Sequence, residues 1–198
     1  MTSLSHPVLV FVYPHARAAY AHSTSDVAAR AKVGDEEHDS TRHLCAVRDG
    51  LEALQQRARG GTAAGENEGE GELKVFGLSG ESPSQQSQVS KALGLNVSRV
   101  KGLLIQLLTI TDQPYGICST LHQFPLLSDP TVTDPSSASS TAFHSALELP
   151  TYSDPATGQR HLQRLTLLFR EGQVNRLDWP VSSSEQTMLR RAAQMLEH

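Results

Sequence analysis

Two cysteines and a nearby serine are the residues of this chain best suited to chemistry. Cys45 lies in the run CAVRD, residues 45–49, and Ser40 precedes it by five positions. The second cysteine, Cys118, lies in the run YGICS. A cysteine thiolate is a nucleophile and a redox centre, whereas a serine hydroxyl ionises too weakly at neutral pH to act alone. These residues therefore indicate thiol redox chemistry, which needs a positive group to stabilise the anion.

The spacing of these residues does not fit the common disulfide or metal sites. Two cysteines cannot form a disulfide scaffold, and the sequence has no Cys-x-x-Cys motif. His38, His43 and Cys45 form a loose cluster without the paired spacing that zinc ligands show. We therefore expect no metal and no other cofactor. Cys45 and Cys118 are left as either a single redox pair or two unrelated buried thiols.

Composition and charge restrict the class of partner. The 198 residues carry a formal net charge of −4, and 38% of them are hydrophobic. A nucleic-acid-binding protein is typically basic, so this balance disfavours nucleic acid. The longest apolar run, residues 103–110, is much shorter than a membrane-spanning helix. The first residues lack the features of a signal peptide, so we expect a cytoplasmic or nuclear protein that is neither secreted nor membrane-bound.

The hydrophobic pattern predicts one α/β domain over residues 1–198, with a mixed central sheet flanked by helices. We expect strands over residues 8–13, 74–79, 124–130, 162–169 and 173–179, and helices over residues 41–59, 83–93, 96–108 and 184–196. Ser40 is a plausible N-cap of the first helix, and Ser82 opens the second with a capping box. We expect long insertions at about residues 15–39, 60–72, 96–122 and 131–160, which are rich in small and polar residues or lie between these elements.

Five short blocks, taken in order, resemble one known family. They are VLVFVYP (8–14), CAVRD (45–49), VFGLSGESP (75–83), FPLLSDP (124–130) and RLTLLFREGQV (164–174). Together they resemble the peroxiredoxins of the AhpC/TSA group, in particular the Q-type or bacterioferritin-comigratory branch. The resemblance implies a thioredoxin-like fold with long loop insertions. It also implies a thiol-dependent peroxidase that reduces hydrogen peroxide and organic hydroperoxides and is itself reduced by thioredoxin or a similar thiol.

The resemblance assigns roles to particular residues and reveals a degenerate motif. Cys45 falls on the resolving cysteine of the Q-type branch, and Ser40 falls on the peroxidatic cysteine. Arg164 matches the arginine that faces the reactive sulfur in the family. The family's Thr and Pro fall on Glu37 and His38. The catalytic candidates are therefore Cys45, Arg164 and the Ser40 position, in a monomer or weak dimer.

Several interpretations remain open on the sequence. A shifted alignment makes Cys45 the peroxidatic thiol, and Cys118 is then a candidate resolving thiol or an incidental cysteine. Ser40 could serve only as a helix cap, and Arg164 could be a surface arginine. The chain could also be a catalytically inactive thioredoxin-like binding module that has lost the peroxidatic cysteine. Finally, residues 15–39 could be intervening sequence read as protein.

Overall fold

A mixed five-stranded sheet forms the centre of the protein. The computed structural model describes residues 6–17, 36–60, 73–95, 124–133, 143–155, 157–182 and 184–197. The strands are β1 (Val8–Val12), β2 (Lys74–Ser79), β3 (Leu126–Ser128), β6 (Leu165–Arg170) and β7 (Gln173–Asp178), in the order β3-β2-β1-β6-β7. β1 pairs in parallel with β2, as does β2 with β3, whereas β6 is antiparallel to both β1 and β7. The predicted mixed α/β sheet is confirmed.

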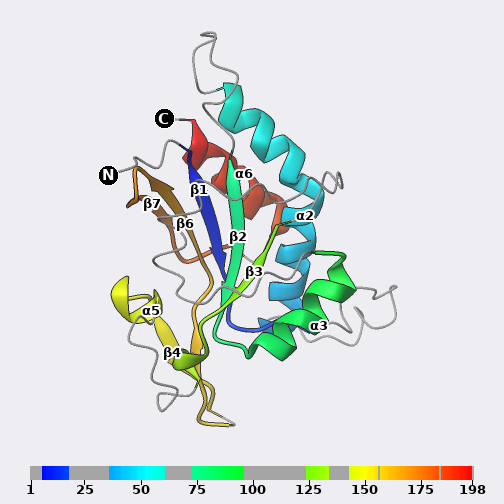
Figure 1. Cartoon of the computed structure of the whole chain (residues 1–198), viewed down its shortest axis with the longest axis vertical. Helices are drawn as coiled ribbons and strands as arrows, with labels where there is room; N and C mark the ends of the chain where they lie inside the picture. The colour runs from blue at the N-terminus through cyan, green and yellow to red at the C-terminus, as the bar shows by residue number, and fades with distance from the viewer. Residues whose placement is uncertain are drawn as a thin grey trace.

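Three helices cover one face of this sheet (Figure 1). They are α2 (Glu36–Gly60), α3 (Pro83–Leu93) and α6 (Glu185–Leu196). Alternate strand residues such as Leu9, Val75 and Leu168 pack against apolar side chains of these helices. The helical contribution to this core is Leu44, Val47, Leu51, Leu54, Ala58, Val89, Leu93, Met188, Ala192, Met195 and Leu196. In α2 the apolar residues recur every three or four positions, so one stripe of the helix faces the sheet.

The opposite face carries shorter elements. These are η2 (Pro130–Val132), α5 (Phe143–Ala146), β4 (Thr151–Ser153) and β5 (Arg160–Leu162). β4 and β5 pair as a separate two-stranded sheet. Phe143, Leu149 and Leu162 pack against strand residues that include Val10 and Leu167. Segment 131–160 was expected to consist mainly of loops, and this is wrong in part, because it also forms these short elements and adds Val132, Phe143 and Leu149 to the second core.

The predicted capping box of α3 is confirmed, and glycines occupy the end of this helix and the turn between β6 and β7. The Ser82 hydroxyl accepts the backbone N–H of Gln85, and the Gln85 side chain accepts the backbone N–H of Ser82, which is a complete capping box. Gly94 ends α3 in the left-handed conformation, with φ of 67°. β6 and β7 are joined by Glu171 and Gly172, both with positive φ, as a tight hairpin requires.

Three predicted element boundaries are wrong. α2 begins at Glu36, so Ser40 lies inside the helix and is not its N-cap. The predicted strand 162–169 is divided: β5 ends at Leu162 and β6 starts at Leu165, because residues 163–164 turn the chain from the small sheet into the large one. The strand expected over 124–130 is limited to β3, residues 126–128. The helix expected over residues 96–108 lies outside the described residues.

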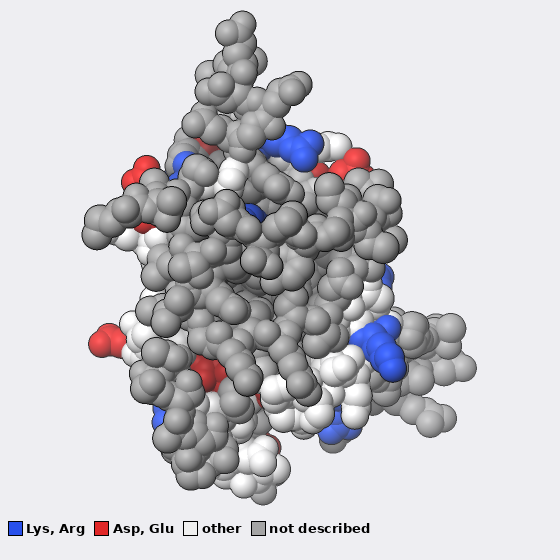
Figure 2. All heavy atoms as spheres, viewed as in Figure 1, with Lys and Arg blue, Asp and Glu red and all other residues white. Residues whose placement is uncertain are grey.

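The described surface carries charges of both signs. Figure 2 shows basic and acidic side chains in small separate groups on one face. On the helical side, Arg42 pairs with Glu185 and Arg57 pairs with Glu197, so ion pairs join α2 to α6 at both ends. Both pairs are largely exposed, and such pairs add little stability. Within the described residues, none of the helices combines the length and apolar character that crossing a bilayer requires.

Candidate functional site

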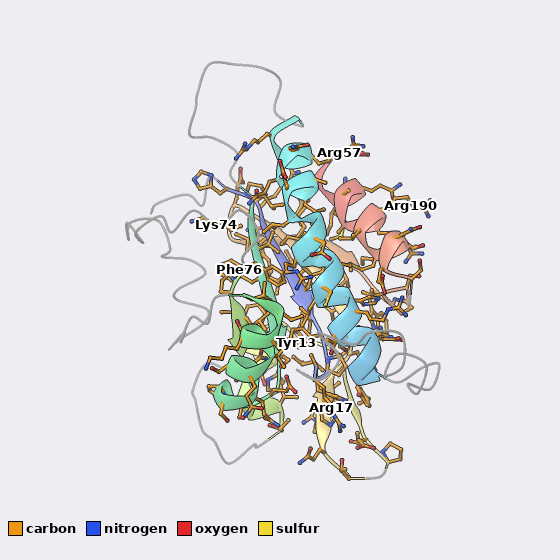
Figure 3. All side chains as sticks on the ribbon, turned by 90° about the vertical axis from the view of Figure 1, so that its right-hand side faces the viewer. Tyr13, Arg17, Arg57, Lys74, Phe76 and Arg190 are labelled. Atoms are coloured by element: carbon orange, nitrogen blue, oxygen red, sulfur yellow. The ribbon has the colours of Figure 1, made fainter. Side chains whose placement is uncertain are left out.

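A small cavity lies where the end of β1, the first turns of α2 and the start of β6 meet. Its volume is about 20 Å³, which is enough for one water-sized group. The cavity is lined by Phe11, Val12, Tyr13, Ser40, His43, Leu44, Val47, Arg164, Leu165, Thr166, Val181 and Met188. Figure 3 shows Tyr13 at the end of the sheet that α2 covers. Most of the lining is apolar, so the few polar groups decide what the cavity can bind.

Ser40 is one of four α2 residues that line this cavity, with His43, Leu44 and Val47. Residues four apart lie on the same side of a helix, so Ser40 shares the sheet-facing stripe with Leu44. Its exposed fraction is 0%, and within the described residues its Oγ has no hydrogen-bond partner. A buried hydroxyl without a partner costs about 1–3 kcal/mol. The cavity therefore offers this hydroxyl to a small polar ligand.

Arg164 brings a positive charge to the same cavity, and Asp39 faces it. Arg164 precedes β6, and its side chain is only 14% exposed, so it is not a surface arginine. Its Nη1 lies 3.6 Å from Oδ2 of Asp39, which is also 14% exposed. Asp39 directly precedes Ser40 in α2. The guanidinium at this cavity is therefore partly neutralised by a carboxylate from the same helix turn.

The segment after β1 is tied to the start of α2 and to β2. The backbone N–H of Arg17 donates to Thr41 Oγ1 at 3.0 Å, and the Thr41 hydroxyl contacts the Arg17 carbonyl at 3.5 Å. The backbone N–H of Ala16 donates to Glu81 Oε1 at 3.4 Å. These bonds hold residues 13–17 beside the helix turn that carries Ser40. The position of the cavity is thus fixed by polar contacts as well as by the core.

Tyr13 is held by a buried network of hydrogen bonds and has a structural role. Its hydroxyl donates to Gln86 Oε1 at 2.6 Å, and Gln86 Nε2 donates to Ser79 Oγ and to the Leu127 carbonyl. Burial is the main cause that raises the pKa of Tyr13 far above its ordinary value, and the Glu81 carboxylate raises it further. Tyr13 therefore stays a neutral donor. The hydroxyl fixes the ring beneath α2 and α3.

Cys45 lies on α2 but does not line the cavity. Five helical residues separate it from Ser40, which places it about 7.5 Å further along the axis and about 140° around it. Cys45 is half-buried and packs against the helix-side core. Burial raises the pKa of its thiol, an effect that the nearby Arg48 guanidinium opposes and that Asp49 and Glu185 reinforce.

A wider groove adjoins the cavity on its solvent side. It has a volume of about 250 Å³ and is lined by Tyr152, Gln163, Arg164, Trp179, Pro180 and Val181. Arg164 and Val181 line both spaces, so the guanidinium lies between the inner cavity and the outer groove. Trp179 is held across the groove by a hydrogen bond from Nε1 to Gln163 Oε1 at 3.1 Å.

The structure thus brings two of the predicted site residues together and separates a third. Ser40 and Arg164 share one cavity, whereas Cys45 lies on another side of α2. Cys118 lies outside the described residues. Sequence reasoning missed Asp39, which pairs with Arg164, and it considered His43 only as a metal ligand, although His43 lines the cavity. His43 lies one helical turn after Ser40, a signal that could have found it, but the spacing of Asp39 gave no comparable hint.

Comparisons with known proteins identify the fold. No protein-family model matches the chain, and no curated protein matches it in sequence. Solved structures do match: reduced Prx3 from Vibrio vulnificus has a TM-score of 0.51 and 15% identity, covering 97% of this chain and 81% of its own. The bacterioferritin comigratory protein of Xanthomonas campestris, described for its alkyl peroxide reduction activity, has a TM-score of 0.51 and 15% identity, covering 98% and 78%.

A third neighbour agrees with these two. Peroxidoxin BcpB from Mycobacterium tuberculosis has a TM-score of 0.50 and 14% identity, covering 96% of this chain and 77% of its own. The likeness to all three structures extends over nearly the whole chain. The chain therefore has the thioredoxin-like fold found in peroxiredoxin structures.

Proposed function

We propose that this chain is a thioredoxin-fold module. Its cavity between Ser40 and Arg164 binds small polar ligands, but Ser40 does not reduce peroxide. One observation carries the proposal: the residue of α2 that lines the Arg164 cavity at the expected reactive position is a fully buried serine, Ser40. Peroxide reduction is a displacement at oxygen by a thiolate. A hydroxyl ionises too weakly for this step and cannot form a sulfenic acid.

The charge arrangement supports the same proposal. A thiolate next to Arg164 would be stabilised by the guanidinium, as opposite charges within about 4–6 Å favour the ionised form. Here the Asp39 carboxylate already faces Arg164 at 3.6 Å. An anion at the Ser40 position would therefore compete with Asp39 for one positive charge. In the otherwise apolar cavity, the facing charges of Arg164 and Asp39 offset each other, which suits binding of a neutral peroxide or water-sized ligand.

The test is to measure peroxide consumption by the reduced full-length chain and by its Ser40→Cys variant. The wild-type chain should consume hydrogen peroxide no faster than free cysteine does. The Ser40→Cys variant should consume it faster, with a sulfenic acid at the new thiol seen by mass spectrometry. A matched Ser90→Cys variant, which also replaces a fully buried helix serine, should show no such gain. Rapid consumption by the wild-type chain would overturn the proposal.

A second candidate function is a thiol-dependent peroxidase that acts through Cys45. It is favoured by one observation, a thiol on the site helix that is only half-buried and so open to peroxide. The substrates would be hydrogen peroxide and organic hydroperoxides, and thioredoxin or a similar thiol would be the reductant. For Cys45 to reach the Arg164 cavity, the first turns of α2 would have to unwind, because the helix separates the two.

Cys45 substitution distinguishes the two candidates. If Cys45 is the nucleophile, a Cys45→Ala variant loses peroxide consumption and a Ser40→Ala variant keeps it. If the cavity only binds, Ser40→Ala leaves the rate at that of free cysteine, and Cys45→Ala removes no more than the share of one ordinary thiol. Cys118 enters the peroxidase candidate as the resolving thiol, and non-reducing mass analysis after low peroxide would detect a Cys45–Cys118 link.

A further inference from the structure

Three polar side chains on the opposite face of the sheet are hydrogen-bonded in the order of a Ser-His-Asp catalytic triad. Asp129 follows β3, and His144 and Ser145 lie in α5. His144 Nδ1 is 3.1 Å from Asp129 Oδ2, and His144 Nε2 is 3.1 Å from Ser145 Oγ. We propose that Ser145 is an activated nucleophile, with His144 as its base and Asp129 as the orienting carboxylate, that reacts with small activated carboxylic esters.

The contacts around the imidazole fix which nitrogen carries the proton. Thr131 Oγ1 donates to Asp129 Oδ1 at 2.5 Å, so its proton is not available to His144. Among the described residues, Nδ1 of His144 faces two acceptors, Asp129 Oδ2 at 3.1 Å and the lone pairs of Thr131 Oγ1 at 3.3 Å. In the neutral ring Nδ1 therefore carries the hydrogen, and Nε2 carries the accepting lone pair. That lone pair faces the Ser145 hydroxyl.

In this triad the carboxylate and the base are largely buried, whereas the nucleophile is exposed to solvent. The side chain of Asp129 is 5% exposed and that of His144 is 11% exposed, whereas Ser145 is exposed. Asp129 Oδ2 also accepts the backbone N–H of His144 at 2.8 Å, so the carboxylate holds both the ring and the backbone that carries it. The imidazole base is thus held in a fixed orientation, and the serine hydroxyl is accessible from solvent.

The covalent step balances with the residues present. Ser145 Oγ attacks the ester carbonyl carbon, and the hydroxyl proton passes to His144 Nε2. The bond from carbon to the leaving alkoxide breaks, and the alkoxide takes the proton from the imidazolium. Water then attacks the acyl-serine by the same route, which returns free Ser145 and a carboxylic acid. Asp129 stays ionised and stabilises the imidazolium throughout.

The first test uses the wild-type chain and an alkyl fluorophosphonate. This probe forms a phosphorus–oxygen bond to an activated serine while fluoride leaves. Peptide mass spectrometry should find Ser145 modified roughly 10²-fold faster than Ser153, an exposed serine of β4. Equal rates at Ser145 and Ser153 would overturn the proposal, and this comparison needs no variant to fold.

A second test uses p-nitrophenyl acetate and three variants whose folding is checked by circular dichroism. Ser145→Ala should abolish acylation at this position and the associated release of nitrophenol, and Ser153→Ala should leave both unchanged. His144→Gln keeps a polar side chain but removes the base, so the rate at Ser145 should fall to that of Ser153. A folded His144→Gln protein that labels at the wild-type rate would show that the cluster only fastens α5 to the turn after β3.

Discussion

The Asp39 carboxylate lies 3.6 Å from the guanidinium of Arg164, one residue before the buried hydroxyl of Ser40. The arginine that would stabilise an anion in the cavity therefore already faces an anion. This pairing links the first turn of α2 to the start of β6, and it makes the electrostatics of the cavity depend on Asp39 as much as on Arg164.

Removing the Asp39 charge should activate a thiol placed in the cavity. In a Cys45→Ala, Ser40→Cys background, Asp39→Asn should lower the pKa of the new thiol, because a carboxylate nearby disfavours the thiolate. A shift of one unit would give about tenfold more thiolate near neutrality. The measurement is the pH dependence of iodoacetamide alkylation at that position. An unchanged or raised pKa would show that Asp39 does not act on the cavity.

Cys45 should react slowly at neutral pH. Burial raises the pKa of its thiol, so a smaller fraction is thiolate at pH 7 than in a free cysteine. The folded state then holds this proton more tightly than the unfolded state, so stability should fall as the pH rises from the unfolded pKa through the folded one. Alkylation followed by mass spectrometry against pH, alongside urea unfolding at the same pH values, tests both statements.

Two neighbouring charges should shift this rate in opposite directions. Asp49 raises the pKa of Cys45, so Asp49→Asn should speed its alkylation, whereas Arg48 lowers it and Arg48→Gln should slow it. Because both charges are at least partly solvated, each change should be about two- to fivefold. Equal effects of the same sign would contradict the electrostatic cause and indicate altered packing instead.

Sequence patterns predicted the sheet and the capping box of α3 better than the site. The run at residues 8–12 is apolar throughout, as a strand covered on both faces must be, and Ser82, Pro83 and Gln85 carry a local signal that needs no tertiary information. The predicted start of α2 was wrong because residues 36–39 include no apolar residue, although the helix extends over them.

The pairing of Ser40 with Arg164 was predicted only through resemblance, and the pairing of Asp39 with Arg164 was not predicted. Residues 40 and 164 are far apart in the sequence, and no periodicity within either segment reports that they meet. Their proximity arises because β6 runs antiparallel to β1, which returns the start of β6 to the end of β1. Such contacts follow from topology, so local pattern alone could not give them.

Gly77 should not tolerate a side chain. A Cβ at this position of β2 would lie 2.6 Å from Leu126 Cδ2 and 3.2 Å from Tyr13 Cε1, and both neighbours are buried. Gly77→Ala should therefore lower the free energy of unfolding by about 1–3 kcal/mol. The matched Gly50→Ala in α2 meets only the Leu189 side chain, at 3.2 Å, and should be neutral or stabilising by up to about 1 kcal/mol. Urea unfolding of both variants is the measurement, and a stable Gly77→Ala protein would contradict the close packing at Tyr13.

Ser40 and Ser90 form a natural pair for testing the cost of the cavity hydroxyl. Both are helix serines with an exposed fraction of 0%. Ser90 Oγ donates to the Leu95 carbonyl at 2.7 Å, whereas within the described residues Ser40 Oγ has no partner. Removing an unpartnered buried hydroxyl relieves its desolvation penalty, but removing a bonded one strands an acceptor.

The two alanine variants should therefore differ in sign. Ser40→Ala should raise the free energy of unfolding by about 1 kcal/mol, helped by the higher helix propensity of alanine. Ser90→Ala should lower it by about 0.5–1 kcal/mol, because the lost hydrogen bond outweighs the same gain in propensity. Urea unfolding of both proteins gives the comparison. If Ser40→Ala were instead destabilising, the hydroxyl would have to be bonded in solution, and the cavity would hold an ordered polar ligand at that atom.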